Sequence, residues 1–306
     1  MPIDRRRAIL LAGATLLSGR AAWSESTPTA SMMLTRKIPS TDEAIPVIGL
    51  GTSGAFDVGD SADERAPLEE VLRLFFTSGA ALIDTAPSYR RAEDVVGDLV
   101  TTIKPAQAFI ATKVSARGKD AGLTQIRDSF EVLRRPVIDL MQIHSLSDWQ
   151  THSATLRDMK AQGKFRYIGI THSRTSAHAE LESVLRADKW DWVQLNFSIE
   201  TRAAEDRLLP LAAEKGVAVM VNRPFEDGAI FQRVADKPLP EWAEDIGCAT
   251  WGQFFLKYVL SHPAVTCVIP ATAKPKHMAD NLAAGKGPLP DAKLRAEMVK
   301  YFESIA

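Results

Sequence analysis

The stretch ALIDTAPSYRRAEDVVGDLVTTIKPAQAFIATK, residues 81–113, contains one complete unit of the pattern that decides the fold. An apolar run over Ala81–Ile83 is followed by a helical pattern over Glu93–Ile103 and then by a second apolar run over Phe109–Thr112. Strands that are separated by a helix of about 10 to 15 residues pair in parallel, through right-handed crossovers. Apolar runs without alternation are typical of strands that are buried on both faces. The stretch therefore predicts a parallel strand–helix–strand unit.

The same alternation continues through most of the chain and gives eight strand–helix units. We expect strands over Val47–Leu50, Ala81–Ile83, Phe109–Thr112, Ile138–Ile143, Tyr167–Ile170, Trp192–Leu195, Val217–Val221 and Thr266–Ile269. The helices that follow them are expected over Asp63–Thr77, Glu93–Ile103, Thr124–Leu133, Trp149–Ala161, Ser176–Ala187, Glu205–Lys215, Thr250–Ser261 and Pro275–Ala284. Eight such units favour an α/β fold of the (β/α)8 TIM-barrel type over an open sheet.

Three further segments lie outside these eight units. Met33–Ile38 and Ala44–Ile48 predict a hairpin at the N-terminal side of the barrel, and Asp291–Ser304 predicts an extra C-terminal helix. Residues 224–249 form the one long stretch without a regular pattern, and such loops often serve as lids. Gly49-Leu50-Gly51-Thr52-Ser53-Gly54 matches the bare GxGxxG pattern, but no helix begins within it, so we do not interpret it as a dinucleotide-binding turn.

The first thirty residues have the composition of an export signal. Arg5-Arg6-Arg7 precedes the apolar run 8–17, which is too short to span a bilayer, and small residues follow. Arg6-Arg7 with the following residues resembles the twin-arginine signal, which implies passage through the twin-arginine export machinery and a periplasmic or otherwise exported protein. The alternative is a basic N-terminal segment without a targeting role. We predict a signal peptide over 1–30, a barrel domain over 31–306 and no stable membrane anchor.

The overall charge points to a small substrate. The chain has 306 residues, of which 37 are basic and 38 acidic, for a net charge of −1. This balance gives no reason to expect nucleic-acid binding. The two cysteines, Cys248 and Cys267, form no zinc-binding pattern, so we predict no metal.

The expected strands end in residues that can bind or transfer a proton. The second strand ends at Asp84, with Tyr89 five positions further on; the third ends at Lys113 and the fourth at His144. Catalytic residues of β/α barrels lie at this end of the strands. We therefore predict one site that contains Asp84, Tyr89, Lys113 and His144.

These four residues suit the reduction of a carbonyl group. Tyr89 would protonate the carbonyl oxygen, and Lys113 would supply the nearby positive charge that a phenol needs to act as an acid at neutral pH. Asp84 would hold the lysine, and His144 would donate a hydrogen bond to the substrate oxygen. A purely structural ion pair explains Asp84 and Lys113 equally well, but it does not explain why Tyr89 and His144 should lie at the same rim.

With these residues in place, the chain resembles an aldo/keto reductase over nearly all of residues 33–285. The matching stretches are Ile48–Thr52, Leu82–Ala86 with Tyr89, Ile110–Lys113, Ile138–His144, Gly163–Ile170 and Val268–Pro270 with Pro275 and Asp280-Asn281. The resemblance places the catalytic tetrad of the family on Asp84, Tyr89, Lys113 and His144. It also implies a nicotinamide dinucleotide that lies extended across the barrel mouth. The cofactor-binding positions that it implies are Gly51, Thr52, Asp84, Thr171, His172, Gln194, Asn222, Arg223, Thr272, His277, Asp280 and Asn281.

The sequence departs from the family pattern at several of these positions. Thr171-His172 replaces the usual Ser-Asn pair, and Asn222 replaces the aromatic residue that commonly stacks on the nicotinamide. Ala271 and His277 stand where Lys and Arg often hold the 2′-phosphate of NADP, and Arg90 replaces the glycine that usually follows the catalytic tyrosine. NADP remains the first choice of cofactor, with NAD as the alternative.

Two functions of different classes follow from the sequence. The first is an exported reductase that converts an aldehyde or ketone to an alcohol. The second is a cofactor-loaded binding or redox-sensing barrel with little turnover, since a periplasmic enzyme has no obvious supply of reduced nicotinamide. A hydrolase is not favoured, because the sequence offers no metal-ligand cluster and no nucleophile–base pair.

Overall fold

The computed structural model describes residues 32–305, and the predicted signal peptide over 1–30 lies outside them. The strands are β1 (Thr35–Lys37), β2 (Ala44–Pro46), β3 (Leu50–Gly51), β4 (Leu82–Asp84), β5 (Phe109–Val114), β6 (Ile138–His144), β7 (Phe165–His172), β8 (Trp192–Asn196), β9 (Ala218–Asn222) and β10 (Cys267–Val268). The α-helices are α1 (Ala62–Thr77), α2 (Ala92–Ile103), α3 (Lys119–Leu133), α4 (Trp149–Ala161), α5 (His178–Ala187), α6 (Leu208–Lys215), α7 (Ala229–Arg233), α8 (Trp251–Leu260), α9 (Pro275–Ala284) and α10 (Ala292–Ile305).

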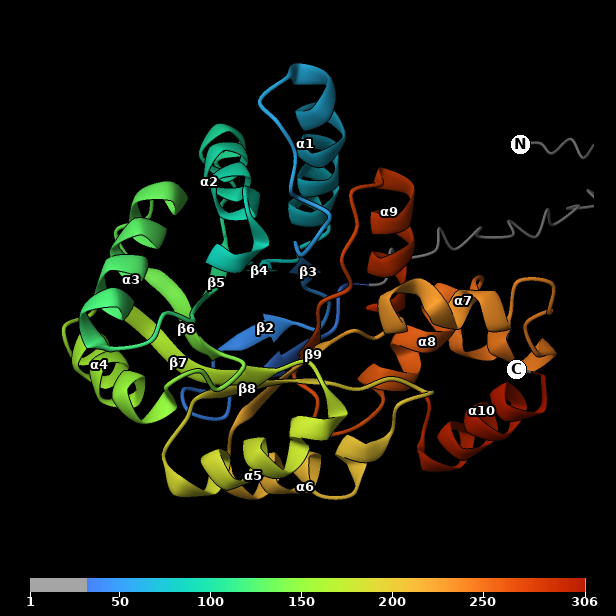
Figure 1. Ribbon diagram of the computed structural model, residues 1–306. Coiled ribbons are helices and arrows are strands. Elements are labelled where there is room, and N and C mark those ends of the chain that lie inside the picture. The colour runs from blue at the N-terminus through green and yellow to red at the C-terminus, as the bar shows by residue number, and fades with distance from the viewer. Residues whose placement is uncertain (1–31, 306) are drawn as a thin grey trace, which may run out of the picture. The chain divides into compact units, whose positions relative to one another are not determined.

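Eight parallel strands form the barrel that the sequence predicts. They pair in the order in which they occur in the chain, from β3 to β10. Two further parallel contacts, between Ile48 and Val268 and between Gly51 and Ala271, connect the first strand to the last and close the sheet. The helices surround the strands, as Figure 1 shows. The predicted fold class is therefore confirmed, and α10 is the expected additional C-terminal helix.

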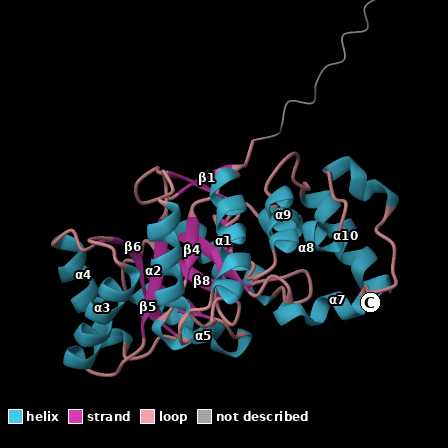
Figure 2. Ribbon diagram, turned by 90° about the horizontal axis from the view of Figure 1, so that it is seen from above, coloured by secondary structure: helices cyan, strands magenta, loops and turns pink. Residues whose placement is uncertain are grey.

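The hairpin β1–β2 fills the end of the barrel at which the strands begin. Its residues Ile38 and Ile45 are buried in an apolar cluster with side chains from inside the barrel, among them Phe109, Tyr167 and Trp192. Figure 2 shows β1 at one end of the strands. A second and larger apolar cluster packs the helices against the outer faces of the strands. One end of the barrel is thus sealed by packing, which leaves the other end for a site.

The strands extend further toward the mouth than their apolar runs. In the observed register Gly51 pairs with Asp84, Lys113 with Gln142, and His144 with Thr171. Seven of the eight predicted strands end one or two residues earlier, because polar side chains interrupt the apolar pattern there, whereas the last, predicted to end at Ile269, ends at Val268. Backbone pairing continues through these residues and fixes them rigidly at the rim.

Two segments differ from the sequence prediction. Helix α3 begins at Lys119 rather than at Thr124, because Gly122 lies inside the helix instead of ending it. A side chain at Gly122 would overlap the ring of His152 on α4. Residues 224–249, expected to be irregular, contain α7 and short 3-10 helices over Glu226–Gly228 and Glu241–Ile246. These helices are too short to produce a recognisable apolar period.

Helices α2 and α3 approach each other closely at Gly97. A Cβ atom at this position would overlap the carbonyl oxygen of Val132, which is backbone and cannot turn aside. We expect Gly97→Ala to lower the free energy of unfolding by about 1 to 3 kcal/mol, because the two helices must move apart. Urea denaturation of the purified protein measures this change. Thr101→Ala, at an exposed position of the same helix, is the matched control and should leave stability nearly unchanged; equal stability of the two variants would contradict the close contact.

Candidate active site

A buried ion pair lies at the centre of the barrel mouth. Lys113 Nζ on β5 is 2.7 Å from Asp84 Oδ2 on β4, and it also donates to the carbonyl oxygen of Thr85 at 2.8 Å. Lys113 is 1% exposed and Asp84 is 2% exposed. Burial by itself would lower the pKa of Lys113, but the charge of Asp84 and the contact with Tyr89 outweigh burial and raise this pKa above its ordinary value. Lys113 is therefore an ammonium ion at neutral pH.

Two glutamines hold the other oxygen of the carboxylate. Gln142 Nε2 donates to Asp84 Oδ1 at 3.0 Å, and Gln194 Nε2 donates to the same atom at 2.8 Å. Gln194 Oε1 in turn accepts from Thr171 Oγ1 at 3.0 Å and from Asn222 Nδ2 at 3.1 Å. A continuous chain of buried hydrogen bonds thus connects the ion pair with two positions that the sequence assigns to cofactor binding.

Tyr89 and His144 complete the predicted tetrad. Lys113 Nζ lies 4.8 Å from the centroid of the Tyr89 ring, and the rings of Tyr89 and His144 meet edge to face with centroids 5.9 Å apart. His144 Nδ1 is 3.3 Å from Ser88 Oγ. Burial, together with the charge of Lys113, lowers the pKa of His144 to about 4. The imidazole is therefore neutral at physiological pH, and it can donate one hydrogen bond without adding charge.

Strained backbone surrounds the tetrad. Arg90 follows Tyr89 with φ 56° and ψ −110°, which is a glycine-type conformation. Ser145 and Leu146 follow His144 with φ 51° and 56°, and Arg223 follows Asn222 with φ 50°. Positive φ at residues other than glycine costs free energy and is concentrated at functional sites. Positive φ values thus occur just after Tyr89, His144 and Asn222, where the chain turns into the barrel mouth. Their free-energy cost supports a functional rather than a purely structural role for these turns.

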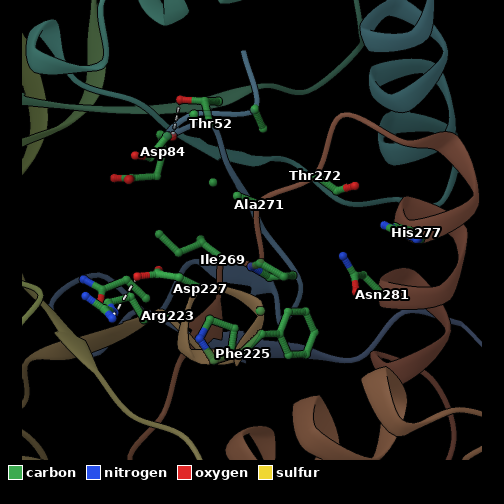
Figure 3. A pocket seen from close by; sticks show the side chains of 18 of the residues that line it. Thr52, Asp84, Arg223, Phe225, Asp227, Ile269, Ala271, Thr272, His277 and Asn281 are labelled. Atoms are coloured by element: carbon green, nitrogen blue, oxygen red, sulfur yellow. Dashed lines mark hydrogen bonds and ion pairs between the residues drawn. The ribbon is translucent and has the colours of Figure 1, made fainter. Parts of the chain in front are cut away.

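A single cavity of about 1130 Å³ opens from the tetrad toward α9, and Figure 3 shows part of its wall. At one end it is lined by Asp84, Tyr89 and His144, and at the other by residues of the segment 269–281. Eleven of the twelve predicted cofactor residues line it, namely Gly51, Thr52, Asp84, Thr171, Gln194, Asn222, Arg223, Thr272, His277, Asp280 and Asn281. The twelfth, His172, is not among the lining residues; its Nδ1 accepts from the backbone N–H of Arg174.

The structure adds lining residues that sequence reasoning missed. Phe231 on α7 and Trp251 on α8 form part of the wall, beside Phe225, which the sequence does suggest as a wall residue. Phe225 and Phe231 contact each other with ring centroids 5.0 Å apart, and Trp251 stacks on Phe255 at 5.5 Å. Phe225 and Phe231 of the segment 224–249 therefore form an aromatic wall together with Trp251 on α8, and no motif in the sequence marks Phe231 or Trp251.

The far end of the cavity is polar but has little positive charge. Asp280 accepts hydrogen bonds from Thr250 Oγ1 at 2.9 Å and from Gln253 Nε2 at 2.7 Å, which hold its carboxylate between α8 and α9. His277 lines the cavity here. The one permanent cation among the described lining residues is Arg223, which forms an ion pair with Asp227 at 2.8 Å.

The cavity has the size and polar groups that a dinucleotide requires. Its elongated lining offers hydroxyl, amide and carboxylate groups on one wall and aromatic rings on another. Asn222 lines the cavity, and its Oδ1 is buried without a hydrogen-bond partner, so it can accept a hydrogen bond from a ligand. Within residues 32–305 no cluster of three His, Cys, Asp or Glu side chains is placed to hold a metal ion. None of the helices described there is long and apolar enough to cross a membrane.

The mouth of the closed β/α barrel holds a tyrosine, a buried lysine–aspartate pair and a neutral histidine beside a long cavity. This combination defines an oxidoreductase site. The comparison with family models gives the particular family: the model of the aldo/keto reductase family matches residues 47–300. The chain therefore belongs to the aldo/keto reductase family.

Two curated relatives from Escherichia coli strain K12 have described activities. Methylglyoxal reductase YeaE is 27% identical over 268 residues, which cover 83% of this chain and 90% of the relative. The NADH-specific methylglyoxal reductase is 28% identical over 229 residues, covering 64% of this chain and 69% of the relative.

Solved structures with the same fold include aldo/keto reductases from Klebsiella pneumoniae. One, in complex with NADP and acetate, superposes with a TM-score of 0.70 at 25% identity and covers 85% of this chain and 93% of its own. Another, in complex with NADPH, gives a TM-score of 0.73 at 24% identity, with 88% and 96% of the two chains covered. These likenesses support the predicted barrel over most of its length.

The lowered pKa of His144 predicts how stability depends on pH. The unfolded chain binds the proton near the ordinary value of 6.5, whereas the folded chain resists it until about 4. The stability that the neutral His144 contributes to the folded state is therefore fully present above pH 6.5 and is lost as the pH falls toward 4. We expect the loss of unfolding free energy between pH 7 and pH 5 to be about 1 to 2 kcal/mol smaller in His144→Gln than in the wild type. Denaturant titrations at both pH values measure it; equal losses in the two proteins would contradict the buried, neutral histidine.

Proposed function

We propose that the protein reduces an aldehyde or ketone to an alcohol at the tetrad, with NADP(H) as the first choice of cofactor and NAD(H) as the alternative. The observation that carries the proposal is the contact between Tyr89 and the buried Lys113, whose ammonium group lies 4.8 Å from the phenol ring. When it is bound, a reduced nicotinamide supplies hydride to the carbonyl carbon. The residues of this chain supply the proton and the orientation.

Tyr89 is the proposed general acid. As negative charge develops on the carbonyl oxygen, the phenol O–H passes its proton to that oxygen, and the neighbouring ammonium stabilises the phenolate that remains. Asp84 keeps Lys113 in place through the 2.7 Å contact. His144, neutral at working pH, donates a hydrogen bond to the same oxygen and thereby aligns the carbonyl with Tyr89.

The cavity supports a dinucleotide in a single orientation. Gln194, Thr171 and Asn222 lie beside Asp84 and would hold the nicotinamide end, while Thr272, His277 and Asn281 lie at the opposite end and would hold the adenosine. The Klebsiella pneumoniae neighbours contain NADP or NADPH, and one Escherichia coli relative is NADH-specific. No Lys or Arg lines the described cavity beside His277, which is the reason to keep NAD as the alternative, although Lys274 and Lys276 are close in the chain.

Tyr89→Phe tests the proposed acid. The variant keeps the ring but lacks the proton, so we expect kcat for methylglyoxal reduction with NADPH to fall by about 10²- to 10⁴-fold. The dissociation constant for NADPH, measured by quenching of protein fluorescence, should change by less than about twofold, since the hydroxyl serves the reaction rather than cofactor binding.

Tyr301→Phe is the matched control, because Tyr301 lies on α10 and bonds to the carbonyl of Pro238 away from the cavity. It should keep the wild-type rate. Retained turnover in Tyr89→Phe would eliminate the proposed acid. Tight NADPH binding by the wild type without any oxidation across a panel of aldehydes would instead favour the cofactor-loaded binding or sensing barrel.

We further propose that the enzyme works after export, in the periplasm or outside the cell. The support is the Arg6-Arg7 motif with the short apolar run that follows it. The twin-arginine machinery carries folded proteins, so this route would allow the barrel to fold around its dinucleotide before export.

Replacing Arg6 and Arg7 together by Lys tests the export route. The substitution keeps the positive charge but removes the arginine pair, so the full-length precursor should accumulate in the cytoplasm. Immunoblots of cytoplasmic and periplasmic fractions check this, with the unaltered chain as the reference. Unchanged export and processing of the Lys variant would rule out the twin-arginine route.

A further inference from the structure

Gln142 is a buried polar residue inside the barrel that the sequence did not assign to the site. It occupies β6 directly opposite Lys113 in the strand register and is 0% exposed. A glutamine at such a position is costly unless its amide is fully used. Its Nε2 donates to Asp84 Oδ1 at 3.0 Å, and its Oε1 accepts from Gln194 Nε2 at 3.3 Å. The residue thus contacts the ion pair of the tetrad without lining the cavity.

We propose that Gln142 is a positioning residue for the reaction: by holding Asp84 Oδ1, it reserves Oδ2 for Lys113 and so fixes the ammonium group beside Tyr89. The inference rests on the proposed carbonyl reduction at the tetrad, and it adds to that proposal a residue that touches neither substrate nor cofactor.

The polarity of the network supports this role. Asp84 can only accept hydrogen bonds, so both glutamines must turn their Nε2 groups toward it. Gln194 then necessarily presents Oε1 to Thr171 and Asn222, both of which donate to it. The carboxylate therefore determines the direction of every hydrogen bond from Asp84 to the rim.

The division of labour between the two glutamines explains why Gln142 is needed. Gln194 lines the cavity and faces the nicotinamide end of the proposed site, so its amide is exposed to rearrangement when a ligand binds. Gln142 does not line the cavity and keeps its hold on Asp84 Oδ1 in either case. Without this second donor the carboxylate is free to turn and to offer both oxygens to Lys113, which draws the ammonium away from the phenol.

Gln142→Met is the first test variant, because methionine has nearly the same length but no donor. We expect kcat for methylglyoxal reduction to fall by about tenfold at every pH, since the acid is no longer held in its working geometry. The dissociation constant for NADPH should stay within about twofold of the wild-type value. A wild-type kcat in this variant would overturn the proposal.

Gln142→Glu is the sharper test, because it makes the contact dependent on pH. A protonated carboxyl can donate to Asp84 Oδ1 as the amide does, whereas an ionised one repels it. The repulsion raises the pKa of the introduced carboxyl, so its proton leaves somewhere between about pH 5 and pH 8. We expect kcat near the wild-type value at pH 5 and a loss of at least about tenfold by pH 8. A profile parallel to that of the wild type would overturn the proposal, as would equal inactivity at both pH values.

Gln125→Met is the matched control. Gln125 also uses its side chain to hold backbone, accepting from the N–H groups of Ser115 and Ala116, but it does not contact Asp84. Its loss should lower stability but leave kcat within about twofold of the wild-type value at every pH. A loss of kcat as large as in Gln142→Met would show that any loosening near β5 has this effect, and it would overturn the specific role of Gln142.

A measurement without turnover separates failure of this inference from failure of the proposed function. The melting temperature of Gln142→Glu, relative to the wild type, should fall progressively from pH 5 to pH 8, because the repulsion between the two carboxylates appears as the proton leaves. If the wild type reduces no carbonyl, the proposed function fails, and the melting series still tests the contact with Asp84. If the wild type turns over and the series shows no pH dependence, only the inference fails.

Discussion

The buried contact between Asp84 and Lys113 is the interaction on which the rest of the site depends. Removing two charges from water is costly, and their attraction offsets the cost only where further hydrogen bonds satisfy the remaining lone pairs and protons. Those bonds come from Thr85, Gln142 and Gln194, so residues on or next to β4, β6 and β8 bind the same ion pair. The barrel supplies the rigidity for this arrangement, since each contributing residue lies in or next to a paired strand. A single ion pair thereby lies in contact with Tyr89 and with the hydrogen bonds that lead through Gln194 to Thr171 and Asn222.

The sequence allowed the barrel and the tetrad to be predicted because both follow from local regularities. Apolar runs mark the strands, and the first polar residue after a run marks the mouth, as at Asp84, Lys113 and His144. Gln142 escaped this reasoning because one glutamine within Ile138–Ile143 looks like an interruption of the strand rather than a part of the site. Phe231 and Trp251 could not be predicted as wall residues in this way. They line the cavity because α7 and α8 come together there, and no local sequence pattern encodes that contact.

The cofactor wall shows how departures from a family pattern can still be coherent. Asn222, where an aromatic residue is usual, joins Gln194 and Thr171 in one set of hydrogen bonds instead of offering a stacking surface. The aromatic surface lies elsewhere, in Phe225, Phe231 and Trp251. The polar contacts are therefore gathered around Gln194, and the aromatic surface lies in and after the segment that follows β9. Changes at single positions would look damaging by themselves, whereas together they preserve a wall with both kinds of contact.

The hairpin at the closed end of the barrel has a consequence for how molecules come and go. Because Ile38 and Ile45 pack with the side chains around them and close one end of the barrel, the barrel interior is open only at the mouth. Any two reactants that meet at the tetrad must enter and leave through the same aperture.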